Sequence, residues 1–110
     1  MVGVIVTFRY GADFDAAKVR KVAEGARARF EGMPGLRSKV FTLNPAAREA
    51  TNFYVWDAES AAKQFFSEEM LALVTGLYGV RPSVSFVEIA ALVDNAQKMG
   101  TSPAEAGVSP

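Results

Sequence analysis

The sequence predicts an α+β domain in which a four-stranded antiparallel sheet carries two helices on one face. The chain has 110 residues, which is the usual size of one domain. Half of its residues are hydrophobic, an ordinary proportion for a chain with a buried core. These residues alternate with polar ones in some segments and recur at helical spacing in others, so strands and helices are both expected.

The chain begins with a predicted strand and a predicted helix. Residues 2–10 alternate between two faces that are both largely apolar or uncharged, and Gly11 ends this strand. Asp13 or Asp15 can cap a helix that runs to about Glu31. One side of this helix is apolar, and its basic residues are predicted to form a solvated face. They are Lys18, Arg20, Lys21, Arg27 and Arg29.

Two further strands are predicted as a hairpin over residues 36–43 and 51–56. A short polar loop that opens at Asn44-Pro45 joins them. In the first of these strands, alternation places Leu36 and Ser38 on one face and Lys39 on the opposite face. In the second, one face carries Asn52, Tyr54 and Trp56.

The second half of the chain predicts a helix and a final strand. Asp57 can cap the helix, which continues to Gly79, and the segment 67–69 could break it and cap it again. The last strand is expected within residues 80–92, with Pro82 near its start.

The resulting order, βαββαβ, is that of the ferredoxin-like fold. Two helices cover one face of such a sheet, yet the predicted strands are apolar or uncharged on both faces. A second copy of the chain, packed sheet against sheet, would cover the other face, so a homodimer is expected. The domain is predicted to occupy residues 1–95, and residues 96–110 to form a flexible tail.

The composition excludes several kinds of site. The sequence contains no cysteine and no histidine, which rules out disulfides, thiolate nucleophiles and the usual zinc and haem ligands. Its 12 basic and 12 acidic residues give no net charge, so nucleic acid is an unexpected partner. No apolar stretch approaches the length of a membrane span, and the start does not resemble a signal peptide, so a cytoplasmic protein is predicted.

Two segments, residues 33–42 and 49–61, resemble the YdhR-like monooxygenases. The shared features are a Pro34-Gly35 turn, a Lys39-Val40 strand, Glu49-Ala50, an aromatic-rich strand and an acidic cap. The similarity extends from the first strand to about Asn95. These proteins belong to the dimeric α+β barrel superfamily, and the resemblance therefore implies two ferredoxin-like subunits, each with a pocket between sheet and helices.

The superfamily includes antibiotic-biosynthesis monooxygenases, which oxidise phenolic compounds without metal or flavin. Their third strand carries an asparagine followed four residues later by a tryptophan, and Asn52 and Trp56 match this spacing. The tyrosine and arginine that follow in those enzymes are replaced by Ala62 and Gly76, although Tyr78 or Arg81 could take their places in space. The resemblance implies a small aromatic substrate, molecular oxygen and no cofactor.

Such a reaction would need a dry pocket, a group that accepts the phenol proton and a group that stabilises the anion. Asn52 and Trp56 could hold a carbonyl oxygen, Tyr54 could relay a proton and Lys39 could stabilise a phenolate. The other candidates are substrate-binding residues, of which Glu88 could also act as a base if it is buried. They are Arg9, Phe65, Phe66, Tyr78 and Glu88.

Each candidate also has a structural interpretation. Trp56 and the phenylalanines could be core residues, and Arg9 and Lys39 could pair with Glu88 across the sheet. Asn52 is the most informative residue, because asparagine is unfavourable in the middle of a strand. Other functions therefore stay open: a binder of small hydrophobic ligands, an isomerase or cyclase, or a structural dimer with a filled interior.

Overall fold

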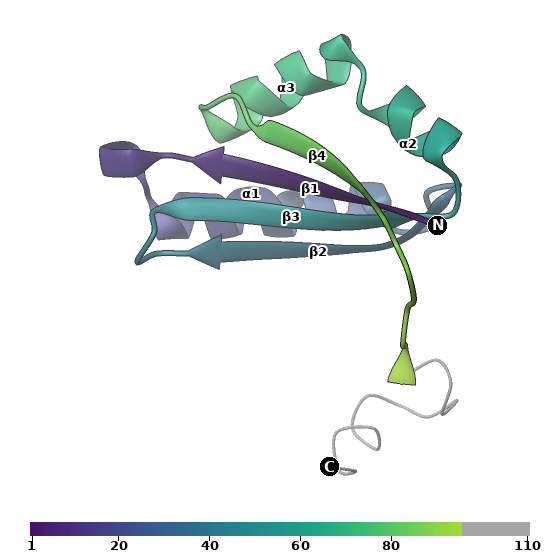
Figure 1. Cartoon of the computed structure of the whole chain (residues 1–110). Coiled ribbons are helices and arrows are strands. Elements are labelled where there is room, and N and C mark those ends of the chain that lie inside the picture. Colours follow the sequence, from purple (N-terminus) through teal and green to yellow (C-terminus); the bar gives the residue numbers. More distant parts are fainter. Residues whose placement is uncertain (96–110) are drawn as a thin grey trace.

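A computed structural model describes residues 1–95 as one antiparallel sheet with three α-helices and a short 3₁₀ helix (Figure 1). The elements in chain order are β1 (Val2–Arg9), the 3₁₀ helix η1 (Gly11–Asp13), α1 (Ala16–Phe30), β2 (Leu36–Asn44), β3 (Glu49–Trp56), α2 (Glu59–Phe65), α3 (Glu68–Tyr78) and β4 (Ser83–Glu88). This confirms the predicted α+β, ferredoxin-like class. The predicted tail, residues 96–110, lies outside the described residues.

The strands lie in the order β2-β3-β1-β4, so β1 and β3 form the middle of the sheet. In their antiparallel register, Val6 lies opposite Asn52 and Val4 lies opposite Tyr54. These side chains point to the face that the helices cover, and all four are buried. The central strands therefore carry both the core and the candidate site.

The predicted strand 36–43 contains a β-bulge. Leu36 lies opposite Trp56, whereas Ser38 lies opposite Val55, so the register shifts between them. The prediction from strict alternation, that Leu36 and Ser38 lie on the same face of the sheet, is therefore wrong. The extra residue turns Leu36 toward the helices, on the same face as Lys39.

Two of the predicted helix caps are present, whereas the predicted cap at Asp57 is wrong: Ala58 is the N-cap of α2, without a side-chain hydrogen bond, and Asp57 accepts one from Arg37. Asp15 accepts a hydrogen bond from the Lys18 backbone N–H at the start of α1, at 3.2 Å. Ser67 accepts one from the Met70 backbone N–H at 3.2 Å, and so the second predicted helix is divided into α2 and α3. Gly79 ends α3 in the left-handed region, with φ at 83°.

The last strand is shorter than predicted. It begins at Ser83, directly after Pro82, and it ends at Glu88. Proline has no backbone N–H to donate to the neighbouring strand, which explains the late start. No helix in residues 1–95 is long and apolar enough to cross a membrane.

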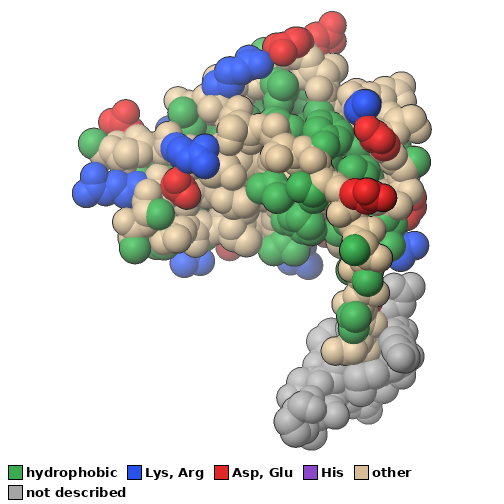
Figure 2. All heavy atoms as spheres, viewed as in Figure 1, with side chains coloured by type: hydrophobic (Ala, Val, Ile, Leu, Met, Phe, Trp, Pro, Cys, Tyr) green, Lys and Arg blue, Asp and Glu red, His purple; other side chains and the backbone are tan. Residues whose placement is uncertain are grey.

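The face of the sheet opposite the helices is apolar near its centre. Ile5, Val40, Phe53 and Val87 occupy this face by register, and Val40 is 52% exposed. Figure 2 shows hydrophobic side chains gathered over the strands, with charged groups toward the ends of the sheet. We call these four residues the open sheet face. No element within the described residues covers it.

Candidate functional site

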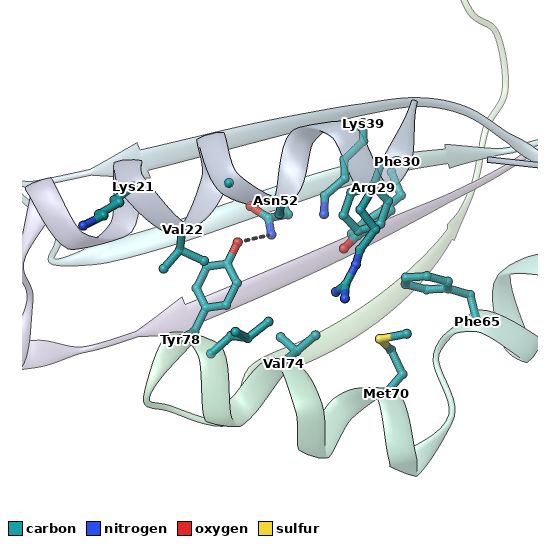
Figure 3. Close-up of a pocket in the computed structure, with 14 residues that line it drawn as sticks. Lys21, Val22, Arg29, Phe30, Lys39, Asn52, Phe65, Met70, Val74 and Tyr78 are labelled. Carbon is teal, nitrogen blue, oxygen red and sulfur yellow. Dashed lines mark hydrogen bonds between the residues drawn. The ribbon is translucent and has the colours of Figure 1, made fainter. Parts of the chain in front are cut away.

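A cavity of about 330 Å³ lies between α1, α3 and the helix-facing side of the sheet (Figure 3). Lys39, Asn52 and Tyr54 of β2 and β3 form its base, and Phe65 of α2 borders one end. The residues that line it are Lys21, Val22, Gly25, Ala26, Arg29, Phe30, Lys39, Asn52, Tyr54, Phe65, Met70, Val74, Leu77 and Tyr78. Its size is at the lower end of the range for small-molecule sites, and its lining is mainly apolar.

Asn52 and Tyr78 form a buried hydrogen bond at the base of the cavity. The Asn52 side-chain amide donates to the Tyr78 hydroxyl at 3.3 Å, and Asn52 is only 3% exposed. The Tyr78 ring stacks on Phe8, with the ring centroids 4.0 Å apart. The pair also borders a second cavity of about 220 Å³ beside α1. A buried amide needs a partner, and Tyr78 explains why asparagine is tolerated in the middle of β3.

Lys39 projects from β2 into a group of three aromatic rings. Its Nζ atom lies 3.4 Å from the centroid of Phe30, 4.0 Å from that of Phe41 and 4.4 Å from that of Tyr54. Burial, and next the nearby positive charge of Arg29, lower the pKa of Lys39 to about 7. The ring faces act in the opposite direction, because they attract the ammonium. Near neutral pH this side chain can therefore either donate or accept a proton.

Two basic residues of α1 also border the cavity. Lys21 and Arg29 were predicted to belong to a solvated helix face, and both residues are indeed exposed. The sequence analysis did not foresee that both also line the cavity. Figure 3 shows the Arg29 side chain extending across the space between α1 and α3. The sequence contained a usable indication: Arg29 follows Val22 by seven residues and Ala26 by three, which places it on their side of the helix.

The remaining aromatic candidates pack next to the cavity. Tyr54 and Phe65 line it, whereas Trp56 and Phe66 are absent from its lining. Trp56 is 2% exposed and lies 5.3 Å from Phe65 between ring centroids. Its indole Nε1 has no hydrogen-bond partner within the described residues. Burial raises the pKa of Tyr54, so this phenol stays protonated at neutral pH.

Arg9 and Glu88 lie outside the cavity and do not pair with each other. Arg9 is at one end of β1, where it forms an ion pair with Glu49 at 3.2 Å. Glu88 is an exposed residue opposite Val2, at the other end of β1. The suggested pairing of Arg9 or Lys39 with Glu88 is therefore wrong, because the strand length separates Arg9 from Glu88 and Lys39 lies among the rings.

Tyr78, rather than Arg81, reaches the candidate site. Arg81 forms an exposed ion pair with Glu68 at 3.2 Å. Tyr78 lies at the end of α3 and contacts Asn52 directly. Among residues 1–95 no group of three or more carboxylates could hold a metal ion. The cavity instead offers an amine, a guanidinium, phenols and an amide, which suit a carbonyl or anionic oxygen.

Solved structures share this fold. Rv0793 from Mycobacterium tuberculosis has a TM-score of 0.63 and 16% identity, over 84% of this chain and 98% of that chain. SnoaB, a cofactor-independent oxygenase from Streptomyces nogalater, has a TM-score of 0.62 and 16% identity, over 84% of this chain and 95% of that chain. The monooxygenase from the gene ActVA-Orf6 of Streptomyces coelicolor, in complex with nanaomycin D, has a TM-score of 0.61 and 19% identity, over 84% of this chain and 89% of that chain.

At the level of sequence, no protein-family model and no curated protein matches the chain. The likeness to the structures above is therefore one of fold. The finer resemblance to the YdhR-like proteins stays a prediction. Solved neighbours also include structures from Deinococcus radiodurans and Caulobacter crescentus, each described as a "putative antibiotic biosynthesis monooxygenase". The chain has the ferredoxin-like α+β fold of the antibiotic-biosynthesis-monooxygenase-like proteins.

Proposed function

We propose that this protein is a cofactor-independent monooxygenase that acts on a small aromatic or quinol-like substrate in the cavity between α1, α3 and the sheet. The observation that carries this proposal is the convergence of Asn52, Tyr78 and Lys39 on one largely apolar cavity. The shared fold adds support, because two of the solved neighbours are described as a cofactor-independent oxygenase and a monooxygenase.

The chemistry needs few protein groups. Molecular oxygen is a triplet, and a metal or flavin normally overcomes the spin barrier to its reaction with organic molecules. An electron-rich phenolate can instead supply the electrons itself. In such a reaction a ring C–H carbon of the phenolate, which is the CH₂ carbon of its keto tautomer, becomes a carbonyl. One atom of O₂ enters the product, and the other leaves as water with the hydrogens that the ring carbon and the phenol lose. The protein has to exclude bulk water, orient the ring and stabilise the developing anion.

The proposed roles follow from position. The Asn52 amide and the Tyr78 hydroxyl hold a substrate oxygen, and Lys39 stabilises the phenolate. Tyr54 and Phe65 contact the flat faces of the ring. Trp56 and Phe66 support these residues from behind, and Arg9 and Glu88 have no part in this proposal because they lie elsewhere.

One observation favours a second candidate, a non-catalytic binder of small hydrophobic ligands. The tyrosine and arginine that the resemblance implies are absent at their expected positions, where Ala62 and Gly76 stand. A cavity without a complete catalytic set could bind a ligand without changing it. Isomerisation or cyclisation in the same cavity would proceed without oxygen, so a measurement of oxygen uptake distinguishes these reactions from oxygenation.

Oxygen consumption by the purified protein, freed of metals and flavins, tests the proposal. The substrates are a panel of hydroquinones and anthrones, and the variants are Asn52→Ala and, as matched control, Arg81→Gln at the exposed ion pair. We expect oxygen uptake that Asn52→Ala reduces and Arg81→Gln leaves unchanged. Uptake no faster than the uncatalysed reaction contradicts the proposal. Binding without turnover then favours the ligand binder, and turnover without oxygen favours an isomerase or cyclase.

A further inference from the structure

The charge around the cavity is one-sided. Among the described residues that line it there are three basic side chains, Lys21, Arg29 and Lys39, and no acidic one. The whole chain, by contrast, has 12 basic and 12 acidic residues. In a protein without net charge, a mainly apolar cavity whose charged lining residues are all basic favours an anionic group there.

Within the described residues Lys39 and Arg29 form no ion pair, unlike some other cations of this protein. Arg9, Arg37 and Arg81 each form an ion pair with a carboxylate at 3.1 to 3.2 Å. Within residues 1–95 no carboxylate lies at ion-pair distance from Lys39 or Arg29. Lys39 is partly buried, whereas Arg29 is exposed. A partly buried charge without a counter-ion is unfavourable, and a bound anion would remove this cost at Lys39.

We infer that Lys39 Nζ is the proton acceptor of the cavity: it takes the ring-hydroxyl proton of a phenolic ligand, while Arg29 provides the second positive charge beside the resulting phenolate. This inference rests on the proposed function, because it assigns the proton acceptor for the phenolic substrate of the same cavity. The phenol O–H bond breaks, an N–H bond forms with the lone pair of the amine, and the phenolate keeps the electron pair. No oxidant or reductant takes part in this step.

The surroundings of Lys39 favour it over every other group there as proton acceptor. The other ionisable groups that line the cavity are Arg29 and Lys21 from α1, Tyr54 from β3 and Tyr78 from α3. Burial raises the pKa of both tyrosines, so they stay protonated. The pKa of Lys39, at about 7, makes its neutral amine available at mildly alkaline pH.

The rings around Lys39 then stabilise the product of the transfer. Phe30 and Phe41 lie 3.4 and 4.0 Å from Nζ between atom and ring centroid. Their faces attract an ammonium but not a neutral amine. Lys39 and Arg29 both line the cavity (Figure 3), and the charge of Arg29 acts on Lys39.

The test uses 2-naphthol at mildly alkaline pH and without oxygen, with 2-methoxynaphthalene as a ligand of similar shape that lacks the acidic proton. We expect the absorption spectrum of naphtholate in the complex, and a pKa of bound 2-naphthol lowered by about one to three units. Lys39→Met should bind 2-naphthol in its neutral form. Lys63→Met, at an exposed ion pair with Glu59, should behave like the unsubstituted protein.

Counting protons separates proton acceptance from simple charge attraction. The unsubstituted protein should release almost no proton when it ionises 2-naphthol, because Lys39 takes it. Lys39→Arg keeps the positive charge but is already protonated, so it should release about one proton per naphtholate formed. Isothermal titration calorimetry in buffers of different ionisation enthalpy measures this number, and circular dichroism shows whether each variant is folded.

The inference is overturned if bound 2-naphthol stays neutral, if both ligands bind equally well, or if the unsubstituted protein and Lys39→Arg release the same number of protons. These readouts need no turnover. A protein that ionises 2-naphthol but consumes no oxygen retains this inference and loses the proposed oxygenase. Oxygen uptake while the bound phenol stays neutral would support the proposed oxygenase and overturn this inference.

Discussion

The hydrogen bond between Asn52 and Tyr78 joins the centre of the sheet to the end of α3. Both residues are buried, and 26 positions separate them in the chain. Their side chains therefore hold two elements together at the place where a substrate oxygen is proposed to bind. At this scale stability and function depend on the same two polar groups.

Removing the Tyr78 hydroxyl should be costly. In Tyr78→Phe the ring still stacks on Phe8, but the Asn52 amide loses its partner in a buried position. We expect the free energy of unfolding to fall by about 1–3 kcal/mol, the usual cost of an unsatisfied buried donor. Urea unfolding measures this, with Tyr10→Phe as a control at a half-buried tyrosine away from Asn52. An unchanged unfolding midpoint would show that the hydrogen bond contributes nothing.

Lys39 should make stability depend on pH. Its folded-state pKa of about 7 lies below its ordinary value of 10.5, so between these values the unfolded chain binds more protons than the folded protein. As pH rises from about 7 toward 10.5, the contribution of Lys39 therefore raises the free energy of unfolding. Below pH 7 the amine is charged in both states, and its burial then has its full destabilising effect.

The comparison with Lys39→Met isolates this effect. We expect the variant to gain most relative to the unsubstituted protein at pH below 7, and this advantage to shrink as pH rises. Denaturant unfolding at a series of pH values measures the difference. A difference that is constant with pH would mean that the amine has an unperturbed pKa.

At the scale of elements, the break between α2 and α3 sets one wall of the cavity. Phe66 ends α2 and Ser67 caps α3, which then brings Met70, Val74 and Tyr78 against the cavity. On the opposite wall, the bulge in β2 keeps Leu36 and Lys39 on the helix-facing side. Small local irregularities therefore decide which side chains reach the cavity.

Ser67→Ala tests the contribution of the cap. The Met70 backbone N–H loses the hydroxyl that accepts its hydrogen bond, so we expect a loss of about 0.5–2 kcal/mol in the free energy of unfolding. Thermal or urea unfolding monitors the change, with Ser38→Ala on the exposed part of β2 as control. If both variants unfold alike, the cap does not stabilise the start of α3.

At the scale of the whole molecule, the open sheet face is the largest unexplained feature. Ile5, Val40, Phe53 and Val87 place apolar side chains where no helix lies. An exposed apolar sheet face is unfavourable in a monomer and is typical of an interface. A homodimer through this face remains our prediction.

Val40→Glu should prevent such a dimer, because Val40, at 52% exposure, is the most accessible residue of the open sheet face, and a carboxylate buried there in the dimer would be unpaired. Light scattering at micromolar concentration should give twice the 11.8 kDa mass of the chain for the unsubstituted protein. Val40→Glu should give the single mass, and Leu73→Glu on exposed α3 should stay dimeric. A single-chain mass for the unsubstituted protein contradicts the dimer.

The local sequence by itself determined the elements. Alternation identified the strands, Asp15 and Ser67 marked helix starts, and Gly79 marked a helix end, because backbone geometry and capping depend on neighbours in the chain. It also indicated that Asn52 needs a special environment, since a strand asparagine requires a buried partner.

Only the tertiary structure decided what those side chains meet. The partner of Asn52 is a tyrosine from another element, and the rings around Lys39 come from α1, β2 and β3. Alternation assigns a residue to a face but not to a position along the sheet, which is why Arg9 was grouped with a cavity it does not reach. Strand register, the β2 bulge and helix packing determine which side chains come into contact. All three result from contacts between residues distant in sequence.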